Sequence, residues 1–227
     1  MLTITATDEW RTAHPDGTIG LLELSGVANG AASEALTQRK REIEARLRDR
    51  YQGFTRPQFL ALPVMAEYDR YYTRFNKTYH VQLQLESIVL KGKTLPDVSP
   101  GVDANFMAEL ETLILTAGHD VEKLRAPVVM DVSREGDQMT PMGGGAARPI
   151  RAGDMIMRDA EGVSCSIIYG QDARSPISPK TSRVLYVAYV PPGIAAEVVE
   201  RQLREIEDHL RLVSPALTME QRRLLGG

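Results

Sequence analysis

The sequence lacks several features that would assign it to a specialised class of protein. Only one of its 227 residues is cysteine, Cys165, so a disulfide within the chain is excluded and a reducing compartment is expected. No apolar run approaches the roughly 18 residues that a membrane helix requires. The amino-terminal residues show no basic segment followed by an apolar one, as a secretory signal would. These absences predict a cytoplasmic protein with no membrane contact.

An excess of positive charge is also missing. The formal net charge is -3, which does not indicate a general polyanion binder, and we expect no DNA partner. Residues 37–50 are rich in Arg and Lys, but Glu42, Glu44 and Asp49 are interleaved with them. On a helix this pattern indicates a solvated face with ion pairs one turn apart.

The usual catalytic motifs are absent. The sequence contains neither an HExxH motif nor a cluster of Cys and His, so we expect no metal and no cofactor. No G-x-S-x-G turn surrounds a serine, and Cys165 is expected in the core. Any catalysis would therefore depend on backbone amides, a positioned water or groups of the substrate itself.

The histidines have competing interpretations. His209 lies among charges on a predicted terminal helix and is expected to face solvent. His119 follows Gly118 at a predicted helix end, where an imidazolium would interact favourably with the helix dipole. His80 begins a predicted element, where a ligand contact and a structural hydrogen bond are both open.

Residues 143–145 are three consecutive glycines. A phosphate-binding loop of the Walker type would require a following Gly-Lys-Ser/Thr and a helix, but Pro149 and Gly153 disfavour a helix there. The run is therefore predicted to be a turn between strands. A turn without side chains can still border a pocket, because a ligand can approach its backbone closely.

The pattern of apolar residues changes along the chain. The first half is rich in predicted helix, and the second half contains short β-rich segments separated by Gly, Asp and Pro. Asp103 is expected to cap a helix that reaches Leu115 and terminates at Gly118. Residues 160–162 are expected to form a hairpin tip. The predicted helices are 31–52, 61–77, 78–93, 103–115 and 193–213, and the predicted strands are 18–27, 126–133, 154–160, 162–170 and 182–190.

This order of elements predicts an α+β fold rather than an alternating parallel-sheet fold. No repeat or linker divides the chain, so we expect a single domain over residues 1–227. Its core is expected over about residues 15–213, with residues 214–227 as a possible loose tail.

An ordered series of motifs resembles a known family. Val102, Asp103 and Asn105 form a V-D-x-N turn opening a helix, and a D-x-x-K-L step follows at residues 120–124. A strand, a polar turn and a glycine-containing turn come next, and residues 154–194 continue with strand, D-x-x-G and strand. Over about residues 15–195, this series resembles the B3/B4 domain of the bacterial phenylalanyl-tRNA synthetase β subunit, and more closely the free-standing B3/B4 proteins.

The resemblance implies a B3/B4-like mixed sheet with flanking helices, and a pocket lined largely by turns. In the synthetase, this domain hydrolyses tyrosine wrongly esterified to the phenylalanine tRNA. The family pattern has His at the position of Ala117, and a double glycine where this chain has Tyr169 and Gly170. The Asn falls two residues after Asp103 rather than three. The tyrosine specificity is therefore not transferred to this chain.

The resemblance implies hydrolysis of an aminoacyl ester on a tRNA 3′ end, acting in trans. The partner would be an aminoacyl-tRNA acceptor end or a small amino-acid-like ligand. A non-catalytic module that binds a metabolite, an amino acid or a protein is the alternative, and a subunit that docks tRNA for another enzyme is a third. The catalytic group is unassigned, with His80, Asn105 and His119 as candidates; the expected substrate contacts are Lys77, Tyr79, Asp103, Gly143, Gly144, Tyr169, Gly170, Arg174 and Thr181.

A rim of basic side chains around the pocket would favour a tRNA end over a small molecule. The residues expected to form it are Lys77, Lys91, Lys93, Arg151, Arg174 and Lys180.

Overall fold

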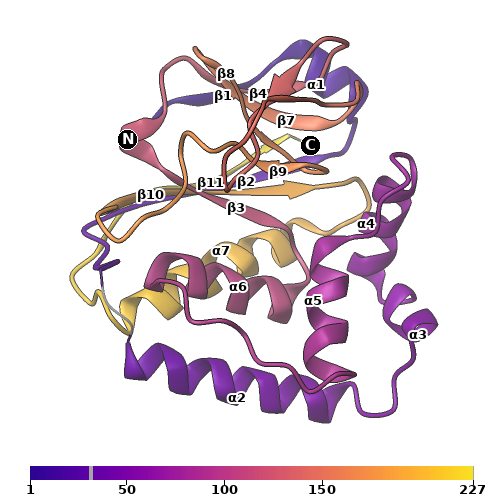
Figure 1. Ribbon diagram of the computed structural model, residues 1–227, viewed down its shortest axis with the longest axis vertical. Coiled ribbons are helices and arrows are strands. Elements are labelled where there is room, and N and C mark those ends of the chain that lie inside the picture. Colours follow the sequence, from indigo (N-terminus) through magenta and orange to yellow (C-terminus); the bar gives the residue numbers. More distant parts are fainter. Residues whose placement is uncertain (31–32, 227) are drawn as a thin grey trace.

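Two main β-sheets are stacked above a group of helices (Figure 1). The computed structural model describes residues 1–30 and 33–226. The sheets are largely antiparallel and helices flank them, which confirms the predicted α+β class. None of the helices in these described ranges is both long and apolar enough to cross a membrane.

The central sheet has four antiparallel strands in the order β11 (Thr218–Gly226), β2 (Thr18–Ser25), β10 (Arg183–Val190) and β3 (Thr116–Asp120). Strands β2 and β10 are apolar along most of their length and buried on both faces. Helix α7 (Ala196–Arg211) approaches β2 closely at Gly20, where an added Cβ would lie 2.8 Å from Val199 Cγ1. Gly20 therefore permits the close contact between helix and sheet.

The second sheet has five strands in the order β1 (Ile4–Ala6), β4 (Val128–Val132), β7 (Met155–Asp159), β8 (Gly162–Ser166) and β9 (Gly170–Gln171). Strand β1 runs parallel to β4, and the remaining pairs are antiparallel. Strands β7 and β8 form the predicted hairpin. A short ladder joins β5 (Gln138–Met139) to β6 (Arg148–Pro149), and the glycine run lies in the turn between them.

Helices cover the free face of the central sheet (Figure 1). Helices α6 (Pro100–Thr112) and α7 lie below it, and α2 (Glu34–Arg50) packs on α6 from the far side. Residues 31–32 of the helix predicted over 31–52 lie outside the described residues. The remaining helical segments are α1 (Asp8–Ala13), α3 (Arg56–Leu60), α4 (Pro63–Thr73), α5 (His80–Val89) and the 3-10 turn η1 (Val121–Lys123).

The bounds of α6 differ from the prediction. The helix begins at Pro100, a residue whose fixed φ suits a first helical turn, and Asp103 already lies inside it. It ends at Thr112 and is capped by Leu113, which adopts a left-handed conformation while its carbonyl accepts a hydrogen bond from Tyr79 Oη at 2.8 Å. Gly118 therefore lies in strand β3 and does not terminate a helix.

Both chain ends contribute more to the fold than expected. Most of the predicted loose tail forms β11, which pairs with β2 along the strand, while residue 227 lies outside the described residues. At the other end, β1 joins the five-stranded sheet, and Trp10 of α1 is buried in the core. The predicted core limits of 15 and 213 were therefore too narrow.

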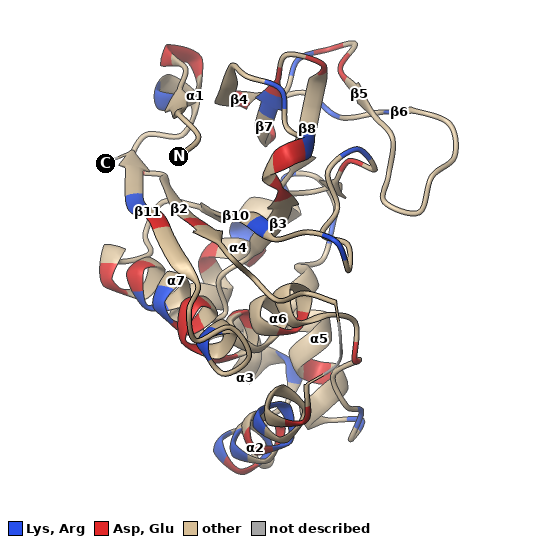
Figure 2. Ribbon diagram, turned by 90° about the vertical axis from the view of Figure 1, so that its left-hand side faces the viewer, with Lys and Arg blue, Asp and Glu red and all other residues tan. Residues whose placement is uncertain are grey.

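The basic segment on α2 is only partly a solvated face. Figure 2 shows Lys/Arg and Asp/Glu intermingled along α2 and α7 rather than separated. Lys40 and Glu44 are nevertheless buried, and Lys40 Nζ donates to Asp103 Oδ2 at 2.8 Å. Because a buried ammonium needs acceptors, this contact ties α2 to the first turn of α6.

Candidate functional site

A cavity of about 220 Å³ lies between helices α5 and α6 and the strands above them. This volume is well above the roughly 10–15 Å³ that one water requires, so the cavity can admit a small organic group. Its walls are mainly apolar, with a smaller number of polar groups. The apolar walls include Phe106, Leu115, Ile167 and Ile177, and the polar ones include His80, Gln84, Asn105, Glu109 and Gln171.

Asn105 presents an unpaired acceptor at this cavity. Its Nδ2 donates to the carbonyl of Thr116 at 2.8 Å, and a carbonyl can only accept, so the amide orientation is fixed. Its Oδ1 is buried and has no hydrogen-bond partner among the described residues. Gln84 and Tyr189 also line the cavity, and Gln84 Oε1 and the Tyr189 hydroxyl are likewise buried without a hydrogen-bond partner among the described residues. Buried polar atoms are normally paired, so these groups indicate a place where a ligand or water completes the contacts.

Glu109 is the acidic group of the cavity. Its Oε1 accepts from the Thr116 amide at 2.7 Å, and the side chain of Asn105 also interacts with this carboxyl group, which is otherwise fully buried. Burial raises the pKa of Glu109 to about 8, because a low-dielectric environment disfavours the charged form. The side chain is therefore mostly a neutral acid at pH 7. Carboxylates are too common in the sequence for this one to be selected without its burial.

His80 lies at the cavity in a defined tautomer. The Tyr72 hydroxyl has one proton, and it donates that proton to the Ile167 carbonyl at 2.6 Å. Tyr72 Oη must therefore accept from His80 Nδ1–H, which lies 3.1 Å away. This leaves His80 Nε2 with a free lone pair. Partial burial and the nearby charge of Lys77 lower the pKa of His80, so the ring is mainly neutral at pH 7.

The structure brings only some of the predicted site residues together. His80, Asn105 and Gly170 all line the cavity, although they belong to α5, α6 and β9. Lys77 lies close enough to influence His80. Tyr169 precedes Gly170, is partly exposed, and accepts from the Arg151 amide at 3.3 Å.

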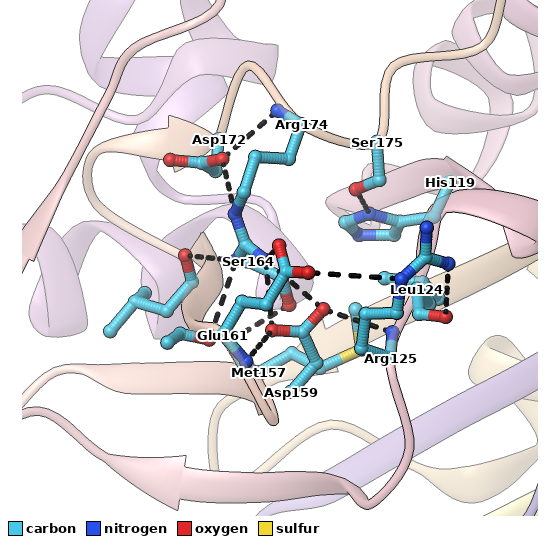
Figure 3. Close-up of polar contacts among 12 residues, drawn as sticks. His119, Leu124, Arg125, Met157, Asp159, Glu161, Ser164, Asp172, Arg174 and Ser175 are labelled. Carbon is cyan, nitrogen blue, oxygen red and sulfur yellow. Dashed lines mark hydrogen bonds and ion pairs between the residues drawn. The ribbon is translucent and has the colours of Figure 1, made fainter.

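Arg174 belongs to a separate group of charges, defined here as the Arg174 cluster: Arg174, Asp159, Glu161 and Asp172 (Figure 3). Its guanidinium contacts Asp159 at 2.9 Å, Asp172 at 2.9 Å and Glu161 at 3.3 Å. It also donates to the Val163 carbonyl at 3.0 Å. Its donors are thus engaged inside the protein. Arg174 does not line the cavity, contrary to the predicted substrate contact.

Three further predicted contacts are structural. Tyr79 is buried and stacks on Tyr68 with ring centroids 4.2 Å apart. Asp103 is held by Lys40, and the buried Thr181 hydroxyl donates to Asp120 Oδ2 at 2.8 Å. Each side chain closes a contact between segments of the fold and does not line the cavity.

The glycine turn lies at the edge of the site rather than within it. Met142 lines the cavity, whereas Gly143 and Gly144 do not. The Gly144 amide donates to the Pro141 carbonyl at 3.0 Å, so it is not free to support an oxyanion. Residues 143–145 all have positive φ, which explains why glycine is used in this turn.

His119 is a buried strand residue and not a helix cap. Its Nδ1 lies 2.8 Å from Ser175 Oγ and 3.0 Å from Gln171 Nε2. Burial lowers the pKa of His119 to about 3, so the ring is neutral at physiological pH. His119 does not line the cavity, but it contacts Gln171, which does and which no local sequence signal distinguishes.

Comparison with known proteins gives a fold likeness only. No family model matches the chain, and neither does any curated protein. A crystal structure of an N-terminal fragment of the phenylalanyl-tRNA synthetase β subunit from Pyrococcus horikoshii is similar, with a TM-score of 0.49 and 9% identity. The match covers 100% of this chain and 55% of the fragment, so the chain spans about half of that fragment's length.

Proposed function

We propose that this chain is a stand-alone B3/B4-like domain that hydrolyses an aminoacyl ester at a tRNA 3′ end, acting in trans. One observation carries the proposal: the unpaired Oδ1 of Asn105 in a cavity whose walls are otherwise mainly apolar. An aminoacyl group has the matching chemistry, because it combines an ammonium donor with a side chain that apolar walls can hold. The motif series between residues 102 and 194 supports the same substrate class.

In this proposal, the fixed amide of Asn105 orients the substrate. Its Oδ1 accepts from the α-ammonium, and a hydrogen bond to a charged donor contributes roughly 1.5–3 kcal/mol. Leu115, Ile167 and Ile177 then surround the amino-acid side chain. This arrangement holds the ester within the cavity that His80 also lines.

His80 is the proposed general base. Its Nε2 lone pair accepts a proton from water, while the hydrogen bond from Nδ1–H to Tyr72 holds the ring. The water oxygen attacks the ester carbonyl, and the ribose oxygen leaves and takes up a proton. Because an aminoacyl ester is already activated, orienting the ester and the water accounts for most of the task.

A deacylation assay with a panel of aminoacyl-tRNAs tests this function. We expect the purified chain to hydrolyse at least one ester, and His80→Gln to lower kcat by about 100-fold or more, the usual range for loss of a general base. Glu197→Gln, an exposed change on α7, is the control and should match the wild type. If the panel stays intact, or His80→Gln is as active as the wild type, the hydrolytic proposal fails.

Binding of a small amino-acid-like ligand without hydrolysis is the second candidate. The observation that favours it is that no Arg or Lys is among the described residues that line the cavity, and that Arg174 is engaged in its cluster. Calorimetric titration with free amino acids distinguishes the candidates. Binding that Asn105→Ala weakens, together with intact aminoacyl-tRNA, would establish this function instead.

A further inference from the structure

A second group of chemically matched side chains lies away from the cavity, where α6 packs against α7. Glu205 and His209 are one turn apart on α7, and Glu111 faces them from α6. One ligand atom of each residue lies within 4.8 Å of the others. His209 is almost fully buried, yet its Nε2 makes no hydrogen bond within the part of the chain that the structure describes.

The distances suit a metal ion with nitrogen and oxygen ligands. His209 Nε2 lies 3.4 Å from Glu111 Oε2 and 4.0 Å from Glu205 Oε2. Two ligands at about 2.1 Å from a tetrahedral zinc are separated by about 3.4 Å. Small rotations of the partly exposed Glu205 side chain would close the remaining gap. One imidazole and two carboxylates, with a water in the fourth position, form a ligand set that zinc accepts.

The neighbouring arginines leave the inner ligand atoms free. Arg46 pairs with Oε1 of Glu111, whereas Oε2 of the same carboxylate faces His209. Arg46 can therefore orient the carboxylate from outside while Oε2 binds a metal, as outer hydrogen-bond partners do in metal sites. Arg50 and Arg201 line the adjoining surface cleft together with Glu111 and Glu205. Their positive charge lowers the affinity for a cation, so a weak to moderate site is expected.

We infer that Glu111, Glu205 and His209 bind a zinc ion that joins α6 to α7. The competing explanation is a direct, metal-free contact of His209 with the two carboxylates, and the experiment separates the two. The ion would fix the carboxyl-terminal part of α6 against the terminal helix. It would stabilise the folded chain progressively as free zinc rises above the dissociation constant, because the unfolded chain does not hold the three ligands together.

Calorimetric titration of the full chain with zinc chloride tests the inference. We expect one equivalent of zinc to bind and the melting temperature to rise, with no effect of magnesium, which prefers oxygen ligands. Glu205→Gln should weaken zinc binding at least tenfold and remove the thermal shift. Glu205 is partly exposed, so this variant should fold. Glu200→Gln, on the same helix and also in an i,i+4 ion pair, is the matched control and should bind zinc like the wild type.

A cobalt-substituted sample gives an independent readout. Visible absorption bands of tetrahedral cobalt should appear with the wild type and with Glu200→Gln, and should be lost in Glu205→Gln. Absence of stoichiometric zinc binding would overturn the inference in favour of a direct, metal-free contact between His209 and the carboxylates. Equal zinc binding by Glu205→Gln and Glu200→Gln would also overturn it, because the ion would then bind elsewhere. Neither outcome depends on ester hydrolysis.

Discussion

The cavity and the Arg174 cluster both contain buried polar groups, but these groups differ in how many of their hydrogen bonds are made within the protein. In the cluster, Asp159 accepts from Arg174, from the Arg125 amide and from the Glu161 amide. In the cavity, Asn105 Oδ1 and Gln84 Oε1 have no partner within the described residues. The comparison shows that a charged residue type does not identify a binding site. A buried polar atom left without a partner is more informative, because burial without a hydrogen bond is costly.

The largest expected effect tests the structural role of the cluster. Arg174→Met leaves the buried Asp159 carboxylate without its counterion, so we expect urea unfolding to show a loss of about 3 kcal/mol. Binding at the cavity should be preserved wherever the variant is folded. Arg125→Met is the matched control: Arg125 and Glu161 form an exposed pair, so the loss should be below about 1 kcal/mol. A selective loss of ligand binding in Arg174→Met would move the site to the cluster.

A second prediction concerns His119, which lies between the two regions. Its folded-state pKa is about 3, whereas the ring in the unfolded chain titrates near its ordinary value of 6.5. The unfolded state therefore binds more protons below pH 6.5, and the stability due to the neutral ring decreases as pH falls towards 3. We expect this residue to account for about 2 kcal/mol of the loss between pH 6.5 and 5.

Urea unfolding over that pH range measures the effect. The His119→Asn variant should be less stable overall. Between pH 6.5 and 5, however, its free energy of unfolding should fall by about 2 kcal/mol less than that of the wild type. Equal slopes for the wild type and the variant would mean that the ring is accessible to protons in the folded state.

The smallest effect separates binding from chemistry within the cavity. Asn105→Ala removes the unpaired acceptor, so we expect KM or the ligand Kd to rise about tenfold, equivalent to about 1.4 kcal/mol. The kcat of Asn105→Ala should change much less than the kcat of His80→Gln, because loss of the general base affects mainly kcat. Glu197→Gln, an exposed change on α7 away from the cavity, serves as the control. If Asn105→Ala leaves affinity unchanged, Asn105 is a structural residue that only supports Thr116.

Parts of the site were accessible from the sequence, but their partners were not. His80 and Asn105 could be selected because each lies at the start of a predicted helix or in a family-like motif. Glu109 and Gln84 could not, because nothing local distinguishes them from other acidic and amide residues. Their significance comes from burial at a shared cavity. The E-x-x-x-H spacing of Glu205 and His209 is visible in the sequence, but Glu111 is remote in the chain and joins them only through helix packing.

The sequence alone determined the elements whose signals are local. The apolar runs predicted β2 and β10, the helical periodicity predicted α2, α5 and α7, and the turn residues predicted the β7–β8 hairpin. Tertiary structure decided what depends on distant partners. Strand β11 forms because the edge of β2 is available to it, α6 ends where the Leu113 carbonyl meets Tyr79, and Arg174 turns inward to buried carboxylates. The physical reason is that hydrogen bonds and ion pairs between remote segments leave no periodic trace in the sequence.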